Sequence, residues 1–167
     1  EKDTNLITLL SDPDRDGVVD ARHDLLTGLN SPFGVAWTDD TLYVAAADAV
    51  LAYPYALGDT EITAEPDILA PLPGGPLNHH WTKDLALGPD GRMLYASVGS
   101  NSNVAENGME AERGRAGIWE IDTDTGKHRP YAAGMRNPNG MAWNPATEEL
   151  WATVQERDML GSDLVPD

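Results

Sequence analysis

The sequence predicts an all-β protein made of antiparallel, four-stranded β-propeller blades. Three observations support this fold class. The apolar segments are short and end at turn residues, the 28 glycines and prolines are spread along the chain, and one strand pattern recurs three times. Long helices are excluded because such frequent turns leave no room for them.

The predicted strands are apolar stretches of four to six residues, each bounded by polar, glycine or proline residues. In chain order they are 34–37, 41–46, 50–53, 84–87, 93–98, 117–121, 140–143 and 150–154. An apolar run at 6–10 is followed at once by aspartates, so it is too short for a signal segment or a membrane span.

The recurring pattern is two strand segments joined by a polar turn, with the second strand beginning Leu-aromatic-small or a close variant. It appears in SPFGVAWTDDTLYVAAADAVLAYPY, TKDLALGPDGRMLYASVGS and NPNGMAWNPATEELWATVQ. Leu42, Leu94 and Leu150 begin the second strand of each copy, and residues 117–121 take the third-strand role of residues 50–53. Repeats of this size with about four strands each are typical of propeller blades, which bury their faces against neighbouring blades.

The strand count gives about three blades, whereas propellers close with four to eight. We therefore expect one partial propeller domain over 1–167, with an acidic leader at 1–29 and blades at 30–167. The chain is expected to be a fragment of a longer protein, although assembly of several copies, or a separate cover for the open faces, would also solve the problem.

The composition narrows the possible partners. The formal charge is −17, from 28 acidic and 11 basic residues, which disfavours nucleic acid and anionic lipid surfaces. We expect no nucleic-acid partner and no membrane insertion. The chain has no cysteine, so disulfides and thiolate metal sites are excluded, while the compartment is left open.

An acidic loop near the start resembles the opening of a calcium-binding loop. Asp12, Asp14, Asp16 and Asp20 alternate with other residues around Gly17, and alternating carboxylates can converge on one hard cation. The twelfth position is His23 instead of a bidentate glutamate, which excludes an ordinary EF-hand. The alternative is an acidic surface loop.

Two adjacent histidines, His79 and His80, stand just before a predicted strand. Successive residues of an extended segment face opposite ways, so at most one imidazole is expected to point into a given pocket. Histidine can accept a proton from a hydroxyl near neutral pH, which makes one of them a candidate general base. The alternative is a pair of ordinary loop residues.

Two further loops carry polar residues suited to a site. GMRNPNG at 134–140 contains Arg136, whose fixed fork of donors suits a carboxylate or a developing oxyanion. QERD at 155–158 follows a strand and could offer oxygens to a cation. The alternatives are a turn in which Arg136 pairs with an acid, and a solvated charge cluster.

Taken together, these stretches resemble the glucose/sorbosone dehydrogenase family of soluble quinoproteins, especially its sorbosone dehydrogenase-like branch. The likeness rests on NHHWTKDLALGPDGRMLYASVGSNSN, GRAGIWEIDTDTGKHRPYAAGMRNPNGMAWNP and ELWATVQERDMLGSDLVPD. It implies a six-bladed propeller that carries pyrroloquinoline quinone (PQQ) and Ca²⁺.

The resemblance also implies roles for single residues. The family's catalytic histidine stands eight positions before the glycine of a GPD turn, which here selects His80, eight before Gly88. His79 falls where glucose-oxidising members have an aspartate. The family's quinone contacts match Arg136 and Asn137, with Asn139 in place of a glutamine. The family's calcium-binding main-chain carbonyls match Glu156 and Arg157.

The implied activity is oxidation of a sugar or sugar-derived aldehyde, with His80 as base, Arg136 stabilising the oxyanion, and electrons passing to an external acceptor. The resemblance further implies a periplasmic or secreted location. Two alternatives stay open, a non-enzymatic propeller module stabilised by calcium at Asp12 to Asp20 and a metal-dependent lactonase on a similar propeller.

Overall fold

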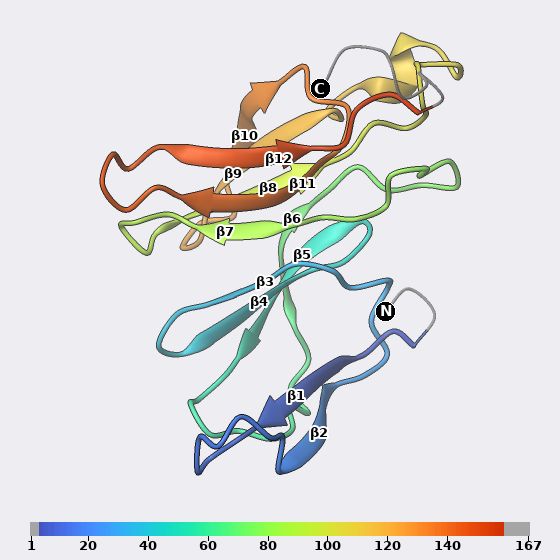
Figure 1. The fold of residues 1–167 in the computed structure, drawn as a ribbon. Helices are drawn as coiled ribbons and strands as arrows, with labels where there is room; N and C mark the ends of the chain where they lie inside the picture. The colour runs from blue at the N-terminus through green and yellow to red at the C-terminus, as the bar shows by residue number, and fades with distance from the viewer. Residues whose placement is uncertain (1–3, 159–167) are drawn as a thin grey trace.

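The computed structural model describes residues 4–158, and within this range the protein is all-β, as the sequence predicts. Twelve strands form two four-stranded and two two-stranded antiparallel sheets, and the only helix in this part of the chain is a single 3₁₀ turn, Met109–Glu112 (Figure 1).

The two four-stranded sheets are complete blades in which each strand pairs with the next along the chain. The first blade contains β3 (Val35–Trp37), β4 (Thr41–Ala45), β5 (Ala49–Pro54) and β6 (Asp67–Pro71). The second contains β7 (Leu85–Leu87), β8 (Met93–Val98), β9 (Gly117–Asp122) and β10 (His128–Ala133). A two-stranded sheet, β11 (Pro138–Trp143) with β12 (Leu150–Val154), follows the second blade.

The strand pairing confirms the predicted repeat. Leu42 pairs with Trp37, Leu94 with Leu87, and Leu150 with Trp143, so the same position in each repeat faces the last residue of the preceding strand. The third-strand role of the 117–121 segment is likewise confirmed, because β5 and β9 are both third in their sheets.

Four strands were not predicted, and their sequences explain why. The outermost strands β6 and β10 lie at sheet edges, and β10 reads HRPYAA and has no buried residue. The other two, β1 (Ile7–Ser11) and β2 (Ala21–Leu26), form a hairpin within the segment expected to be an acidic leader.

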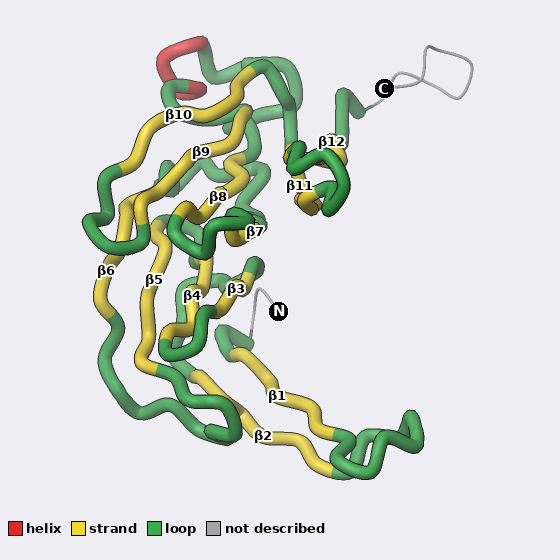
Figure 2. The backbone as a smooth tube through the Cα atoms, turned by 90° about the vertical axis from the view of Figure 1, so that its left-hand side faces the viewer, coloured by secondary structure: helices red, strands yellow, loops and turns green. Residues whose placement is uncertain are grey.

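The blades lie side by side along an arc, with β3, β7 and β11 on its inner side and β6 and β10 on its outer side (Figure 2). One apolar core fills the space between the two complete blades, including Val50, Leu94 and Ile121. A second core joins the β1–β2 hairpin to the first blade through Leu25 and Leu26 on one side and Leu42 and Val44 on the other.

This arrangement determines which loops meet. In an antiparallel pair the start of one strand and the end of the next share one end of the sheet. The segments before β7 and β11 and those after β8 and β12 therefore gather at the same end of the blades (Figure 1). Between residues 4 and 158 the chain has no helix with the length and apolarity needed to cross a membrane.

Candidate functional site

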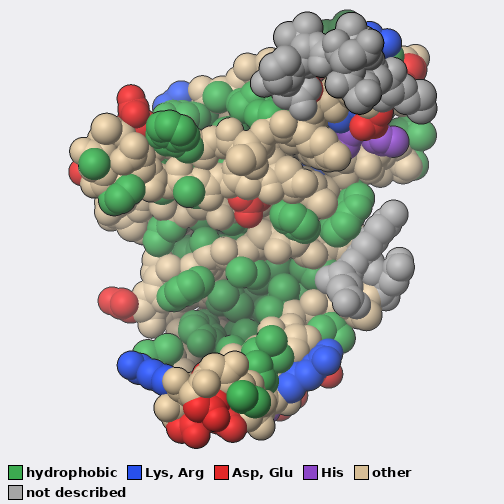
Figure 3. All heavy atoms as spheres, viewed as in Figure 1, with side chains coloured by type: hydrophobic (Ala, Val, Ile, Leu, Met, Phe, Trp, Pro, Cys, Tyr) green, Lys and Arg blue, Asp and Glu red, His purple; other side chains and the backbone are tan. Residues whose placement is uncertain are grey.

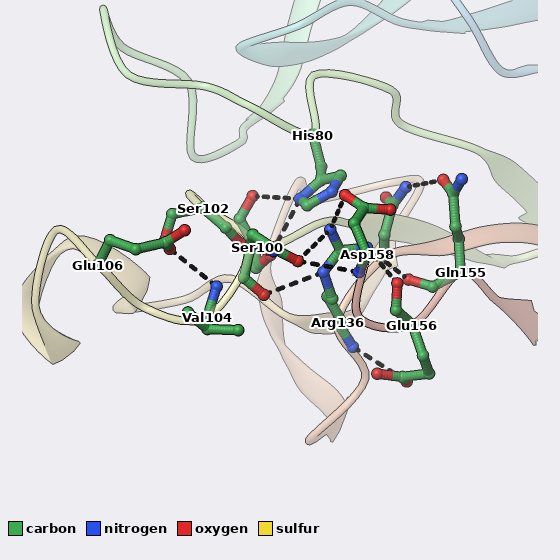
Figure 4. Close-up of polar contacts among 11 residues, drawn as sticks. His80, Ser100, Ser102, Val104, Glu106, Arg136, Gln155, Glu156 and Asp158 are labelled. Atoms are coloured by element: carbon green, nitrogen blue, oxygen red, sulfur yellow. Dashed lines mark hydrogen bonds and ion pairs between the residues drawn. The ribbon is translucent and has the colours of Figure 1, made fainter. Parts of the chain in front are cut away.

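His80 lies in the segment before β7 with its imidazole buried. Its Nδ1 is 3.0 Å from the main-chain oxygen of Ser100 and 2.9 Å from the Ser100 hydroxyl, in the segment after β8 (Figure 4). The Ser100 hydroxyl donates to the carbonyl of Ser102 at 2.6 Å.

These contacts determine the tautomer of His80. A carbonyl oxygen only accepts hydrogen bonds, so the hydrogen must be on Nδ1, and the neutral ring leaves Nε2 unprotonated. Burial lowers the pKa of His80 below its ordinary value of 6.5, with Arg136 and His79 lowering it further against a raising effect of Ser100 and Asp158. The imidazole is therefore a neutral potential base at neutral pH.

Gly99 lies between His80 and Asn137. A Cβ atom at this position would overlap the Cβ of His80 and stand 2.5 Å from the Oδ1 of Asn137, which only glycine avoids. Asn137 is buried and donates through Nδ2 to the Oε1 of Gln155 at 3.2 Å, while its buried Oδ1 accepts no hydrogen bond from any residue between 4 and 158.

The Arg136 side chain is buried beside this histidine, and its peptide is joined to the same loop, because the Ser100 N–H donates to the carbonyl of Arg136 at 2.7 Å. The Ser100 peptide thus bridges the segments that carry His80 and Arg136. The structure brings these two predicted residues together at one end of the blades, although their positions are 56 residues apart in sequence numbering, from 80 to 136.

All three nitrogens of the Arg136 guanidinium donate to oxygens of the protein. Its Nε and Nη2 donate to the main-chain and side-chain oxygens of Asn103 at 3.0 and 2.8 Å, and Nη1 donates to the carbonyls of Gln155 and Glu156 at 3.1 and 2.5 Å. Nη2 also pairs with the Asp158 carboxylate at 2.7 Å. The arginine therefore organises the segment after β12 and holds an anion at its tip.

The remaining predicted site residues differ in their surroundings. Asn139 is exposed and stands at the register shift between Pro138 and Gly140 in β11. The carbonyl of Glu156 accepts from Arg136, whereas the Arg157 side chain is exposed. Asn139 thus lies in the inner strand β11, and Glu156 and Arg157 lie in the segment after β12, which Arg136 contacts.

A polar cleft of about 540 Å³ opens at His79, the residue before His80. His79 lines it, and the two imidazoles meet edge to face at 4.6 Å between ring centres. The other lining residues come from the segments before β7 and after β8, and half of them are asparagines: Pro76, Leu77, Asn78, Asn101, Ser102, Asn103, Glu106 and Asn107.

The acidic loop lies apart, between β1 and β2. Carboxylate oxygens of Asp12, Asp14 and Asp20 come within 4.8 Å of one another. Asp16 accepts instead from the N–H of Val18 at 2.7 Å. His23, at the twelfth position, is in strand β2 opposite Leu9, so it lies outside the loop.

The sequence predicted no role for Ser100 or Asn103, and for Asp158 it predicted only that the QERD segment could offer oxygens to a cation. The first two belong to a run, GSNSN, whose polar character was visible but whose partners were not. Asp158 stood in a charge cluster whose simplest interpretation was solvation. Only the pairing of the chain's segments reveals that all three contact His80 or Arg136.

Comparison with known proteins places the chain in a family. Residues 5–165 match the TrAA12-like family, so the chain belongs to it. The finer assignment to a sorbosone dehydrogenase-like branch stays a prediction. An uncharacterized protein of Borreliella burgdorferi is 24% identical over 147 residues, covering 83% of this chain and 38% of the relative.

Two solved proteins share the fold. A structure of Trichoderma reesei Carbohydrate-Active Enzymes Family AA12 has a TM-score of 0.78 at 21% identity, covering 94% of this chain and 42% of that one. The holo form of the pyranose dehydrogenase PQQ domain from Coprinopsis cinerea has a TM-score of 0.73 at 17% identity, covering 90% and 39%. The chain thus spans about two fifths of the length of these relatives.

Proposed function

We propose that this chain is part of a PQQ-dependent dehydrogenase that oxidises a sugar or a sugar-derived aldehyde, of aldose or sorbosone type. The observation that carries the proposal is the juxtaposition of a neutral, buried His80 with the buried guanidinium of Arg136 through the Ser100 peptide. Family membership and the PQQ domain named in the Coprinopsis cinerea structure support it.

The residues present suit an anionic, hydrogen-bonding cofactor. Arg136 already holds the half-exposed carboxylate of Asp158, which is a stand-in for an acidic group of a ligand. The buried Oδ1 of Asn137 finds no donor in the described part of the chain, and a buried acceptor without a partner is costly unless a ligand supplies one. Arg136, Asn137 and the exposed Asn139 would hold PQQ, which when bound supplies an acceptor for one hydride, that is, for two electrons and a proton.

The protein's own groups have defined tasks in this proposal. The unprotonated Nε2 of His80 accepts the proton of a substrate hydroxyl, while Ser100 keeps the hydrogen on Nδ1. Arg136 stabilises negative charge that develops beside it. The amide-lined cleft next to His79 offers donors and acceptors for sugar hydroxyls.

Calcium is part of the proposal at two places. The main-chain carbonyls of Glu156 and Arg157 would hold Ca²⁺ at the cofactor, and the Glu156 carbonyl, which already accepts from Arg136, has a second lone pair to offer an ion. A second, structural ion would bind Asp12, Asp14 and Asp20, with Asp16 nearby. The Trichoderma reesei protein has also been solved as a calcium structure, with a TM-score of 0.76 and 21% identity.

The cellular setting follows from the same proposal. The substrate would be a small sugar or aldehyde, the electrons would pass to an external acceptor, and the location would be periplasmic or secreted. The alternative is a non-enzymatic binding module. In that case calcium in the acidic loop would only stabilise the fold.

The test adds PQQ and Ca²⁺ to the protein, follows binding by the absorbance of the quinone, and then measures reduction of a dye with aldoses and with sorbosone. His80→Ala is expected to retain quinone binding and to lose about 10²- to 10⁴-fold in turnover, because it removes the base. His128→Ala is the matched control, since His128 is an exposed histidine on β10 away from the site.

Failure of both this chain and a longer one to bind the quinone would overturn the dehydrogenase proposal. Full turnover by His80→Ala would show that the base has been assigned to the wrong residue.

A further inference from the structure

A groove of about 540 Å³ lies between the two complete blades, and its size is typical of small-molecule sites. The β3–β4 turn, the end of β5 and the start of β6 line it on one side, and the β9–β10 turn lines it on the other. In antiparallel sheets these turns lie at the end opposite the segments that carry His80 and Arg136. The groove is therefore separate from the candidate redox site.

The β9–β10 turn packs closely against β6, as Figure 2 shows. Gly126 in this turn has a φ of 67°, and a Cβ atom there would overlap the carbonyl oxygen of Leu69 in β6. Asp122 anchors the turn by accepting from the N–H and from the hydroxyl of Thr125, each at 2.9 Å. The two walls of the groove are therefore fixed against each other.

The floor of the groove is a row of cross-strand partners. Tyr43 of β4 pairs with Ala52 of β5, and Ala52 pairs with Asp67 of β6, so the three side chains share one face of the sheet. Tyr43 is only 6% exposed, because it packs in the core between the blades. Asp67, at the outer end of the row, is exposed. The row thus runs from a buried phenol to an exposed carboxylate.

The same row in the second blade has all of its polar groups paired. Tyr95 takes the place of Tyr43 in the repeat, and its hydroxyl donates to its cross-strand partner Glu120 at 3.0 Å. Glu120 also pairs with Arg129, the next residue of the row, at 2.6 Å. Phenol, carboxylate and guanidinium therefore satisfy one another within the protein.

The row of the first blade lacks these partners. Ala52 stands in place of Glu120 and cannot accept a hydrogen bond, and the outer position holds a carboxylate, Asp67, instead of an arginine. The Tyr43 hydroxyl has no hydrogen-bond partner between residues 4 and 158, although this buried side chain lines the groove. A buried polar group without a partner is costly unless a ligand supplies one. A cation with N–H donors would satisfy both the phenol oxygen and the carboxylate.

The charges of the groove narrow the class of ligand further. Its acidic lining residues are Asp40, Asp67 and Asp124, and none of its lining residues is basic. Between residues 4 and 158, three groups close enough to share one metal ion occur only in the acidic loop, where acidic side chains gather at the tip of the β1–β2 hairpin (Figure 3). Separated carboxylates beside the apolar Ala52 and Leu69 instead suit separated cations on an aliphatic chain.

We propose that this groove binds a linear aliphatic polyamine. Its ammonium groups donate to the Tyr43 oxygen and to the carboxylates of Asp40, Asp67 and Asp124, and its methylene groups lie on the apolar part of the floor. The site goes beyond the proposed redox function and does not depend on it, because the two sites lie at opposite ends of the blades.

Specific binding has to be distinguished from the general attraction of an acidic protein for cations. The formal charge of −17 attracts any cation to the surface. At about 150 mM NaCl this attraction is largely screened beyond about 8 Å, whereas partly buried contacts are screened less. The binding measurements are therefore made at this salt concentration.

Isothermal titration calorimetry with spermidine tests the site, and we expect saturable binding. Tyr43→Phe removes only the hydroxyl and should weaken binding by about 10-fold, because a hydrogen bond to a charged group is lost. Tyr131→Phe is the matched control, since it removes the same hydroxyl from an exposed tyrosine of β10 that does not line the groove. This variant should bind spermidine as tightly as wild type.

Three further measurements test the charges and the location. Asp67→Asn should weaken binding by about 10-fold, whereas Asp24→Asn, the same change at an exposed aspartate of β2, should not. n-Butylamine, which has a single ammonium, should bind more weakly than spermidine. In amide NMR spectra, spermidine should shift the signals of residues 67–69 and 123–126 more than those of the acidic loop.

An absence of saturable spermidine binding would overturn the proposal. Equal affinities of wild type and Tyr43→Phe, or NMR shifts confined to the acidic loop, would overturn it as well. Either of these last two results would show that spermidine binds the acidic surface without using the groove.

Discussion

Lys83 is the least expected single residue of the structure. Its side chain is fully buried, and its Nζ donates to the carbonyl of Trp81 at 3.0 Å. Burial lowers the pKa of Lys83 to about 7, with Arg115 lowering it further and Asp48 opposing the change. An amine with this pKa is partly neutral at physiological pH, and it holds the carbonyl of Trp81, the residue after His80.

Replacement of this lysine should change how stability depends on pH. Between about pH 7 and pH 10 the unfolded chain keeps the Lys83 proton and the folded chain has lost it, so the contribution of Lys83 to the unfolding free energy rises with pH across this window. Lys83→Met removes that contribution. The unfolding free energy of wild type minus that of Lys83→Met should therefore increase by roughly 2–4 kcal/mol between pH 6.5 and pH 10.

Urea unfolding of both proteins at several pH values measures this difference. Lys127→Met is the control, because Lys127 is another lysine of the chain and lies in the turn before β10. A wild-type minus variant difference that stays flat from pH 6.5 to pH 10 would show that Lys83 remains charged in the folded protein.

At the same scale, the sequence predicted the chemistry of His80 and Arg136 but not their partners. An imidazole and a guanidinium have fixed donor and acceptor properties, so their suitability could be judged from residue type alone. Burial and the Nδ1–H tautomer depend on Ser100, and the acceptors of Arg136 come from Asn103 and Asp158. These partners lie far from His80 and Arg136 along the chain, and the packing of the blades brings them together. A local sequence pattern therefore could not predict the contacts.

At the scale of elements, the segment after β8 contacts both His80 and Arg136, and Gly99 allows His80 and Asn137 to approach this segment closely. We expect Gly99→Ala to destabilise the protein by about 1–3 kcal/mol, because its Cβ would overlap both His80 and Asn137. The change should also displace the imidazole, which would appear as an altered titration of His80 by NMR.

Gly88→Ala is the comparison variant, since a Cβ there would meet its nearest neighbour at 3.0 Å, a milder contact. Urea unfolding of the two variants measures the difference. Equal costs, with an unchanged His80 titration, would show that the loop yields easily and does not position the histidine.

The acidic loop between β1 and β2 is the other element with a testable property. Addition of Ca²⁺ at about ten times its dissociation constant should raise the unfolding free energy by roughly 1.4 kcal/mol, because the ion binds only the folded loop. Asp14→Asn should abolish this increase by removing one of three clustered carboxylates.

Thermal unfolding with Ca²⁺ and with a chelator checks this prediction. Asp39→Asn, in the exposed turn between β3 and β4, is the control with the same chemical change and should keep the response. A calcium response that survives in Asp14→Asn would place the ion elsewhere.

For the whole molecule, excess negative charge is the dominant electrostatic feature. Like charges repel more strongly in the compact state than in the expanded chain, so the formal charge of −17 is expected to lower stability at low ionic strength. Raising NaCl from about 20 mM to about 500 mM should therefore raise the midpoint of thermal unfolding.

Calorimetry at several salt concentrations measures this midpoint. The protein concentration is kept low and fixed, so that the degree of association between chains does not change. A falling midpoint would mean that surface ion pairs such as Arg92–Asp122 and Arg129–Glu120 outweigh the repulsion. Their arginines are mostly exposed, so we expect these pairs to contribute little.

The sequence by itself determined the fold class, the repeat and the inner strands of each blade, because alternation, turn residues and recurrence are local properties of the chain. Tertiary structure alone decided that residues 7–26 form a hairpin packed on the first blade, that the outer strands β6 and β10 exist, and that His80, Ser100 and Arg136 share one end of the blades. The reason is that edge pairing and loop convergence depend on which sheets stack, and stacking depends on contacts between residues far apart along the chain.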